Sequence, residues 1–79
     1  MKVQVKLFGI FCDFFPPGTK GPGFWLEMEE EAGLKEVISK LKIPEDLPRS
    51  IILNGRAAKG DFPLKEGDVV AIFTPITVG

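Results

Sequence analysis

A single segment of the chain has the periodicity of an amphipathic helix, and segments with strand patterns lie on both sides of it. Its apolar side chains recur one helical turn apart, at Leu34, Val37, Ile38 and Leu41. Glutamates precede it and Lys40 and Lys42 lie near its end, which suits the helix dipole. Ala32 and Gly33 offer no side-chain cap, and Pro44 is expected to stop the helix. The fold must therefore combine one helix with a sheet.

The strand patterns predict how that sheet is arranged. Residues 2–8 alternate polar and apolar side chains, and residues 24–28 form an aromatic-rich alternating run. Residues 50–53 read as a short strand, after which Asn54-Gly55 predicts a tight hairpin turn into residues 56–59. Residues 69–73 are apolar on both faces, as in a central strand. The predicted order is ββαββ, with the last strand central.

One helix across one face of a mixed sheet is the simplest way for a chain of this size to bury its apolar residues. This arrangement is an α+β, ubiquitin-like β-grasp fold. We expect residues 1–79 to form a single domain in which residues 74–79 are an extended C-terminal tail.

Composition excludes several classes of function. The 79 residues contain 10 Lys and Arg against 11 Asp and Glu, which argues against nucleic acid or an anionic membrane surface as a partner. The absence of His and Tyr removes common general bases and metal ligands, so we expect no self-contained catalytic site, no bound metal and no bound cofactor. The first residues lack a signal-peptide core and no apolar run could span a membrane, so a cytoplasmic protein is expected.

The stretch from Ile10 to Trp25 is rich in aromatic residues and contains a Pro- and Gly-rich loop at residues 16–23. Its rings either form a partner-binding surface or are covered by the loop folding back over them. Cys12 cannot form an internal disulfide, because it is the chain's single cysteine. Its thiol is either a packed small hydrophobe or a sulfur-relay group.

Two further pairs of residues allow two interpretations each. Val70 and Ile72 are either an exposed apolar strip on the last strand or are covered on a central strand. Arg56 and Lys59 either meet acidic groups on a partner or are solvated at the hairpin tip.

Three fragments, in this order and around one helix, resemble the MoaD/ThiS family of sulfur-carrier proteins. They are V-x-V-K-L-F-G at Val3–Gly9, I-L-N-G-R at Ile52–Arg56 and P-L-K-E-G-D-V-V-A-I-F-T-P at Pro63–Pro75. The phrase A-I-F-T-P after G-D is more similar to the MoaD branch, the small subunits of molybdopterin synthase, than to the shorter thiamine-pathway carriers.

The resemblance implies a function for the end of the chain. An E1-like activating enzyme would use MgATP to adenylate the carboxylate of Gly79, and a sulfur donor would convert it to a thiocarboxylate. The tail would then deliver sulfur in molybdopterin synthesis by entering the large synthase subunit. The residues implied in partner binding are Phe73, Thr74, Pro75, Ile76, Thr77 and Val78.

The chain departs from the family at Val78, where the family has the first glycine of a Gly-Gly end. The sequence is compatible with a trimmed terminus, with a partner that tolerates valine, or with a protein that has left the carrier role. Other sulfur acceptors, in thiamine, tungsten-cofactor or another thio-metabolite pathway, also stay open. So do a protein modifier joined to lysines through Gly79 and a non-carrier module that binds through the stretch from Ile10 to Trp25.

Overall fold

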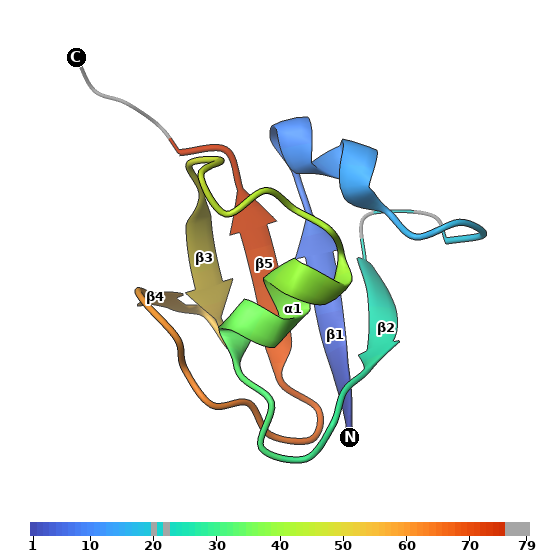
Figure 1. Ribbon diagram of the computed structural model, residues 1–79, viewed down its shortest axis with the longest axis vertical. Coiled ribbons are helices and arrows are strands. Elements are labelled where there is room, and N and C mark those ends of the chain that lie inside the picture. Colours follow the sequence, from blue (N-terminus) through green and yellow to red (C-terminus); the bar gives the residue numbers. More distant parts are fainter. Residues whose placement is uncertain (20, 22, 76–79) are drawn as a thin grey trace.

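The last strand of the chain lies at the centre of the sheet. The computed structural model describes residues 1–19, 21 and 23–75, and across these residues five strands form one sheet in the order β2-β1-β5-β3-β4 (Figure 1). β5 pairs in parallel with β1 and antiparallel with β3. The two outer pairs, β1–β2 and β3–β4, are antiparallel. The strands are β1 (Lys2–Leu7), β2 (Gly23–Glu27), β3 (Ser50–Leu53), β4 (Arg56–Ala58) and β5 (Val69–Phe73).

The predicted α+β β-grasp architecture and the central last strand are thereby confirmed. The predicted element order contained one strand too few, because the second arm of the Asn54-Gly55 hairpin forms β4. Asn54 and Gly55 both have positive φ, at 51° and 84°, as a tight turn of this kind requires.

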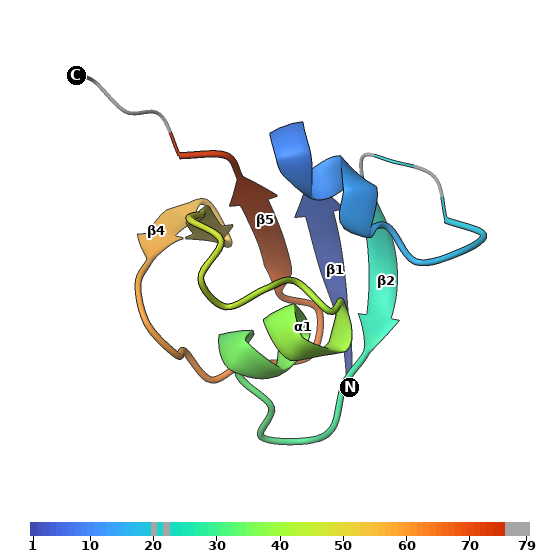
Figure 2. The same cartoon turned by 45° about the horizontal axis from the view of Figure 1, so that its top comes forward.

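Helix α1 (Leu34–Lys40) crosses one face of the sheet, in front of β1 and β5 (Figures 1 and 2). Its buried side chains Leu34, Val37 and Ile38 belong to the same core as the inward residues of the strands. Val70 and Ile72 are fully buried in that core, so the covered interpretation of these two residues is confirmed. The strand residues of the core are Val3, Val5, Leu7, Phe24, Leu26, Val70 and Ile72.

The start of α1 is stabilised by two carboxylates. The carboxylate of Glu36 accepts a hydrogen bond from the N–H of Gly33 at 2.8 Å. Asp61, in the segment after β4, accepts the N–H of Lys35 at 3.1 Å. The first turn of a helix has N–H groups with no partner inside the helix, so these bonds replace the missing side-chain cap.

The helix ends earlier than its apolar pattern predicts. Lys42 has a φ of 61°, and its N–H bonds the carbonyl of Ser39 at 3.0 Å. The N–H of Ile43 bonds the carbonyl of Ile38 at 3.1 Å. These two bonds form a Schellman motif, which closes α1 at Lys40, ahead of Pro44.

The aromatic stretch after β1 folds back over the core. Residues Gly9–Phe14 form a short 3-10 helix that the sequence pattern did not predict, and its Phe11 is fully buried. Phe15 packs edge-to-face on Phe24 with ring centroids 5.6 Å apart. Trp25 is the exception among these rings, since 60% of it is exposed. Most of these rings are therefore buried or half-buried against the core, whereas Trp25 remains available to a partner.

Neither helix in the described part of the chain is long and apolar enough to cross a membrane.

Candidate functional site

The candidate site begins where β5 ends, at the root of the predicted tail. Phe73, the last residue of β5, stacks on Phe8 with ring centroids 4.9 Å apart and planes 9° from parallel. The N–H of Phe8 also bonds the carbonyl of Ile72 at 3.0 Å, one residue past the end of β1. These contacts fix the direction in which the chain leaves the sheet.

The next residue, Thr74, is held by the segment that follows Phe8. Its hydroxyl oxygen accepts a hydrogen bond from the N–H of Ile10 at 3.1 Å. Gly9 has a φ of +60°, and a Cβ at this position would overlap the Thr74 hydroxyl. Glycine is therefore required at position 9 by both its backbone conformation and the approach of Thr74. We call this arrangement of Gly9, Ile10 and Thr74 the tail clasp.

The sheet face that α1 leaves uncovered carries an apolar strip beside the tail clasp. The strand register places Ala71 between Lys6 and Ile52, and Phe73 follows on the same face two residues later. Ile52 and Phe73 are half-buried. We call Ile52, Ala71, Phe73 and Phe8 the apolar strip. A partner protein that docks on it would lie directly beside the point where the tail begins.

The structure describes only part of the predicted partner-binding set. Phe73 belongs to the apolar strip, Thr74 is exposed and clasped, and Pro75 is half-buried. Ile76, Thr77 and Val78, and Gly79 as the predicted carrier of the sulfur, lie outside the described residues.

Sequence reasoning missed the residues that hold the tail root, which are Phe8, Gly9 and Ile10. A signal for them was present, because the first family-like fragment continues past the strand pattern to Gly9. Parallel pairing of the first and last strands brings the end of each to the same edge of the sheet, so the residues after both strands meet there.

The chemistry available on the described residues is limited. They contain no group of three or more His, Cys, Asp or Glu side chains that could hold a metal ion. Cys12 is exposed, and its thiol lies 3.5 Å from the carbonyl of Leu7. The interpretation of Cys12 as a packed small hydrophobe is therefore wrong. The described part of the site can bind a partner and orient the start of the tail.

Comparison with known proteins shows the family to which the chain belongs. The sequence model of the ThiS family matches residues 5–79. A solved structure of a putative molybdopterin converting factor, subunit 1, from Pyrococcus furiosus is 30% identical with a TM-score of 0.73, over 95% of this chain and 98% of that one. No curated protein matches the sequence.

Two further structures are similar. A chain in the complex of subunits 1 and 2 of the molybdopterin-converting factor from Helicobacter pylori 26695 is 28% identical with a TM-score of 0.64, over the whole of both chains. SAMP1 from Haloferax volcanii shares the fold, with a TM-score of 0.68 at 18% identity over the whole of both chains. The family match spans nearly the entire sequence, and the chain belongs to the ThiS family of ThiS/MoaD-like sulfur carriers.

Proposed function

We propose that this chain is a sulfur carrier that donates sulfur in molybdopterin synthesis, through a thiocarboxylate formed on Gly79. It acts in the cytoplasm and has no catalytic site of its own. An E1-like enzyme activates it, and the large subunit of a molybdopterin synthase receives its tail.

The observation that carries the proposal is the juxtaposition of the apolar strip and the tail clasp. Phe73 belongs to the strip and Thr74 to the clasp, so the surface that docks a partner is covalently continuous with the segment that enters it. The family match extends through the tail to residue 79. Membership of a family of small carriers and complex subunits supports a protein that supplies a reactive end to other enzymes.

The chemistry determines which protein supplies each reacting group. A carboxylate is a poor electrophile, so its oxygen first attacks the α-phosphorus of MgATP in the activating enzyme, and pyrophosphate leaves. Hydrosulfide from a sulfur donor then displaces AMP from the acyl adenylate, and loss of its proton leaves a thiocarboxylate on Gly79. The activating enzyme holds the nucleotide throughout. The carrier's own contribution is the carboxylate and its delivery, and neither requires a base on the chain.

Two similar structures, both of molybdopterin converting factor subunits, favour molybdopterin synthesis over other acceptor pathways. One of them is described in a complex of subunits 1 and 2, which supports a large-subunit partner for this chain. Thiamine and tungsten-cofactor pathways are alternative acceptors, and they are distinguished by which partner removes the sulfur.

The test begins with the intact mass of the protein isolated from its own cells and fragmentation of its C-terminal peptide. We expect one terminal oxygen to be replaced by sulfur, and the same spectrum establishes the native end of the chain. With the cognate activating enzyme and MgATP, the full chain should form an acyl adenylate. A chain lacking Gly79 should fold equally well and form no transferable thiocarboxylate.

An unmodified carboxylate, together with no adenylate after incubation with the activating enzyme, would refute the carrier proposal. It would favour the non-carrier interaction module, for which the exposed Trp25 is the specific observation. In that case the chain lacking Gly79 would bind its partner unchanged, whereas Trp25→Ala would weaken binding.

A further inference from the structure

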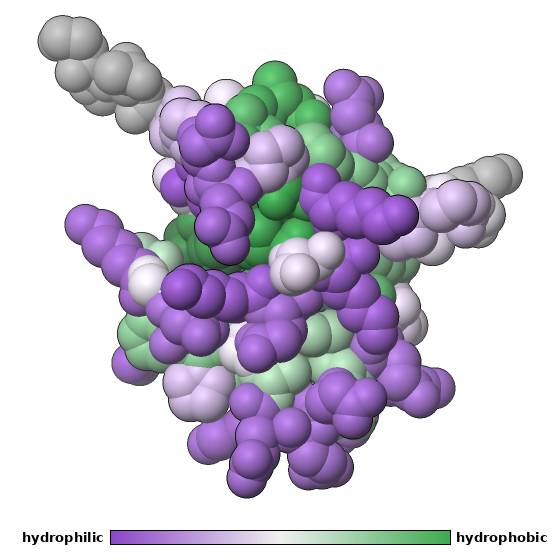
Figure 3. All heavy atoms as spheres, viewed as in Figure 1, coloured by the Kyte–Doolittle hydropathy of each residue, from purple (hydrophilic) through white to green (hydrophobic). Residues whose placement is uncertain are grey.

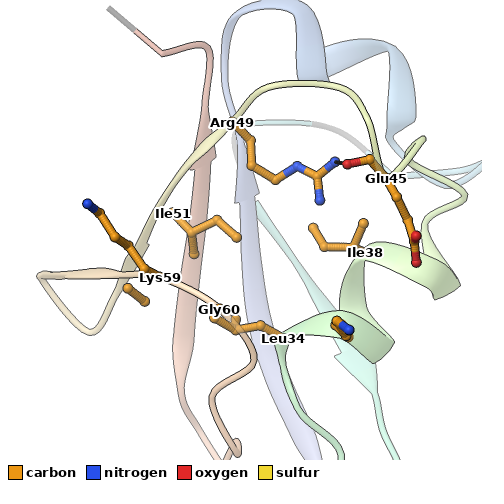
Figure 4. Close-up of a pocket in the computed structure, with 9 residues that line it drawn as sticks. Leu34, Ile38, Glu45, Arg49, Ile51, Lys59 and Gly60 are labelled. Atoms are coloured by element: carbon orange, nitrogen blue, oxygen red, sulfur yellow. Dashed lines mark hydrogen bonds between the residues drawn. The ribbon is translucent and has the colours of Figure 1, made fainter.

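A groove lies on the helix-bearing side of the molecule, between α1 and the β3–β4 hairpin, and encloses about 420 Å³. Its apolar lining comes from α1 and both strands of the hairpin (Figure 4). In the space-filling view, hydrophobic surface on this side is bordered by hydrophilic side chains (Figure 3). The apolar lining residues are Leu34, Ile38, Ile51 and Ala58.

Arg49 lines this groove, and its guanidinium is held in place by backbone carbonyls. Nε donates to the carbonyl of Leu47 at 3.0 Å. Nη2 donates to the carbonyls of Pro44 and Glu45 at 2.6 and 3.1 Å. Within the described residues Nη1 donates to no acceptor, and no carboxylate pairs with the group. A guanidinium fixed in this way has donors free for a carboxylate and loses little entropy when it binds one.

The other charges around the groove favour an anionic occupant. Lys35 from α1 and Lys59 after β4 also line it, against the single carboxylate of Glu45. The side chain of Glu45 extends away from the Arg49 guanidinium (Figure 4). Three cations and one anion thus surround an apolar floor.

We propose that this groove binds an extended acidic segment of a partner protein. One aliphatic side chain of the segment lies on the apolar floor, and a flanking carboxylate binds Arg49. This inference does not rest on the carrier function. The groove lies on the same side of the sheet as α1, whereas the apolar strip lies on the opposite face, so both surfaces can be occupied at once.

The neighbouring strand favours a peptide over a small acid. β4 is the last strand in the sheet order, so its outer backbone groups have no strand partner among the described residues. An extended peptide can bond to such an edge while one of its side chains reaches over Ala58 into the groove. A small carboxylic acid gains nothing from that edge.

The test uses the full chain and short random peptides displayed on phage. We expect the selected peptides to place two or more acidic residues beside one aliphatic residue. A synthetic peptide of the consensus sequence, titrated into 15N-labelled protein, should shift the amide signals of Leu34, Ile38, Ile51 and Ala58 most strongly. A matched peptide with Asn and Gln in place of the acids should bind at least about tenfold more weakly, because it lacks the charged partners.

Charge reversal on the β3–β4 hairpin supplies a matched pair of variants. Lys59 follows β4 and lines the groove, so Lys59→Glu should weaken binding of the acidic peptide about fivefold or more. Arg56 begins β4 and does not line the groove, so Arg56→Glu should change binding less than twofold. Selected peptides without acids, signal shifts centred elsewhere, or equal effects of the two variants would overturn the proposal. If free glutarate displaced the acidic peptide as well as unlabelled peptide does, the proposal would also be overturned, in favour of a site for small carboxylic acids.

Discussion

The tail clasp depends on a glycine that no other residue can replace without cost. Gly9→Ala places a Cβ against the Thr74 hydroxyl in a left-handed backbone conformation. We expect it to lower the free energy of unfolding by about 2–4 kcal/mol, measured by urea denaturation. Gly55→Ala is the matched control, because Gly55 has a φ of +84° with nothing within 4 Å of the added Cβ. It should cost only about 1 kcal/mol, from backbone strain.

A double-mutant cycle separates the clasp from the strain. If the Thr74 hydroxyl causes part of the stability loss in Gly9→Ala, that substitution should lower the free energy of unfolding by less in a Thr74→Ala background. The difference should be about 1 kcal/mol or more. Additive costs would mean that the hydroxyl does not carry the conflict. Adenylation by the activating enzyme that we propose is a separate measurement, in which Thr74→Ala should raise the KM for this chain because the clasp orients the tail.

For single residues, the sequence was a better guide to which positions are important than to the contact that each side chain makes. Gly9 stands in a family-like fragment, yet its role depends on Thr74, and the clasp bond from Ile10 spans 64 positions. No local pattern reports such a contact. Cys12 differs, because its exposed thiol lies in a local element, the 3-10 helix Gly9–Phe14, that the sequence pattern did not predict.

Among the elements, α1 depends on a residue outside itself. Asp61→Ala removes the acceptor of the Lys35 N–H and should lower the free energy of unfolding by about 0.5–2 kcal/mol, measured by thermal or urea denaturation. Asp46 is the control, because its carboxylate is exposed in a loop and accepts no backbone N–H among the described residues. Asp46→Ala should change the free energy of unfolding by less than about 0.5 kcal/mol. Equal losses would show that general charge effects explain the result.

The strands and the helix were predictable because their signals are local. Alternation in residues 2–8 and the turn pair Asn54-Gly55 each report the structure of their own segment. The ends of α1 were not predictable. At its start, Asp61 accepts the N–H of Lys35 across 26 positions of sequence, and after its end Lys42 adopts a positive φ that glycine usually provides. Asn54 illustrates both cases: its turn was expected, but its hydrogen bonds to Asp68 and Val69 were not.

For the molecule as a whole, the aromatic stretch divides into core and surface. Phe11 is fully buried, so Phe11→Ala should cost about 3–5 kcal/mol, which is a large share of the stability of so small a domain. Trp25→Ala should cost less than about 0.5 kcal/mol, because most of that side chain is exposed. Urea denaturation measures both. A large loss at Trp25 would contradict its placement on the surface.

The β-grasp architecture was predictable at this scale because few arrangements bury one helix and a doubly apolar last strand in so short a chain. The central place of the last strand followed from the same reasoning, since residues 69–73 are apolar on both faces, but the spatial order of the other strands was not predicted. The groove beside α1 was not predictable, because it depends on how the hairpin is placed relative to the helix. The apolar strip was not predictable in full, because the strand register brings its side chains together from separate segments of the chain.

The position of β5 also bears on how the protein is made. Before residues 69–73 leave the ribosome, the nascent chain can form only two separate hairpin-like pairs, β1–β2 and β3–β4, with no strand to join them. Sheet assembly therefore waits until translation has passed β5. A copy truncated ahead of Val69 has neither an assembled sheet nor the tail, so folding itself ensures that only chains long enough to carry the tail root present a docking surface to a partner.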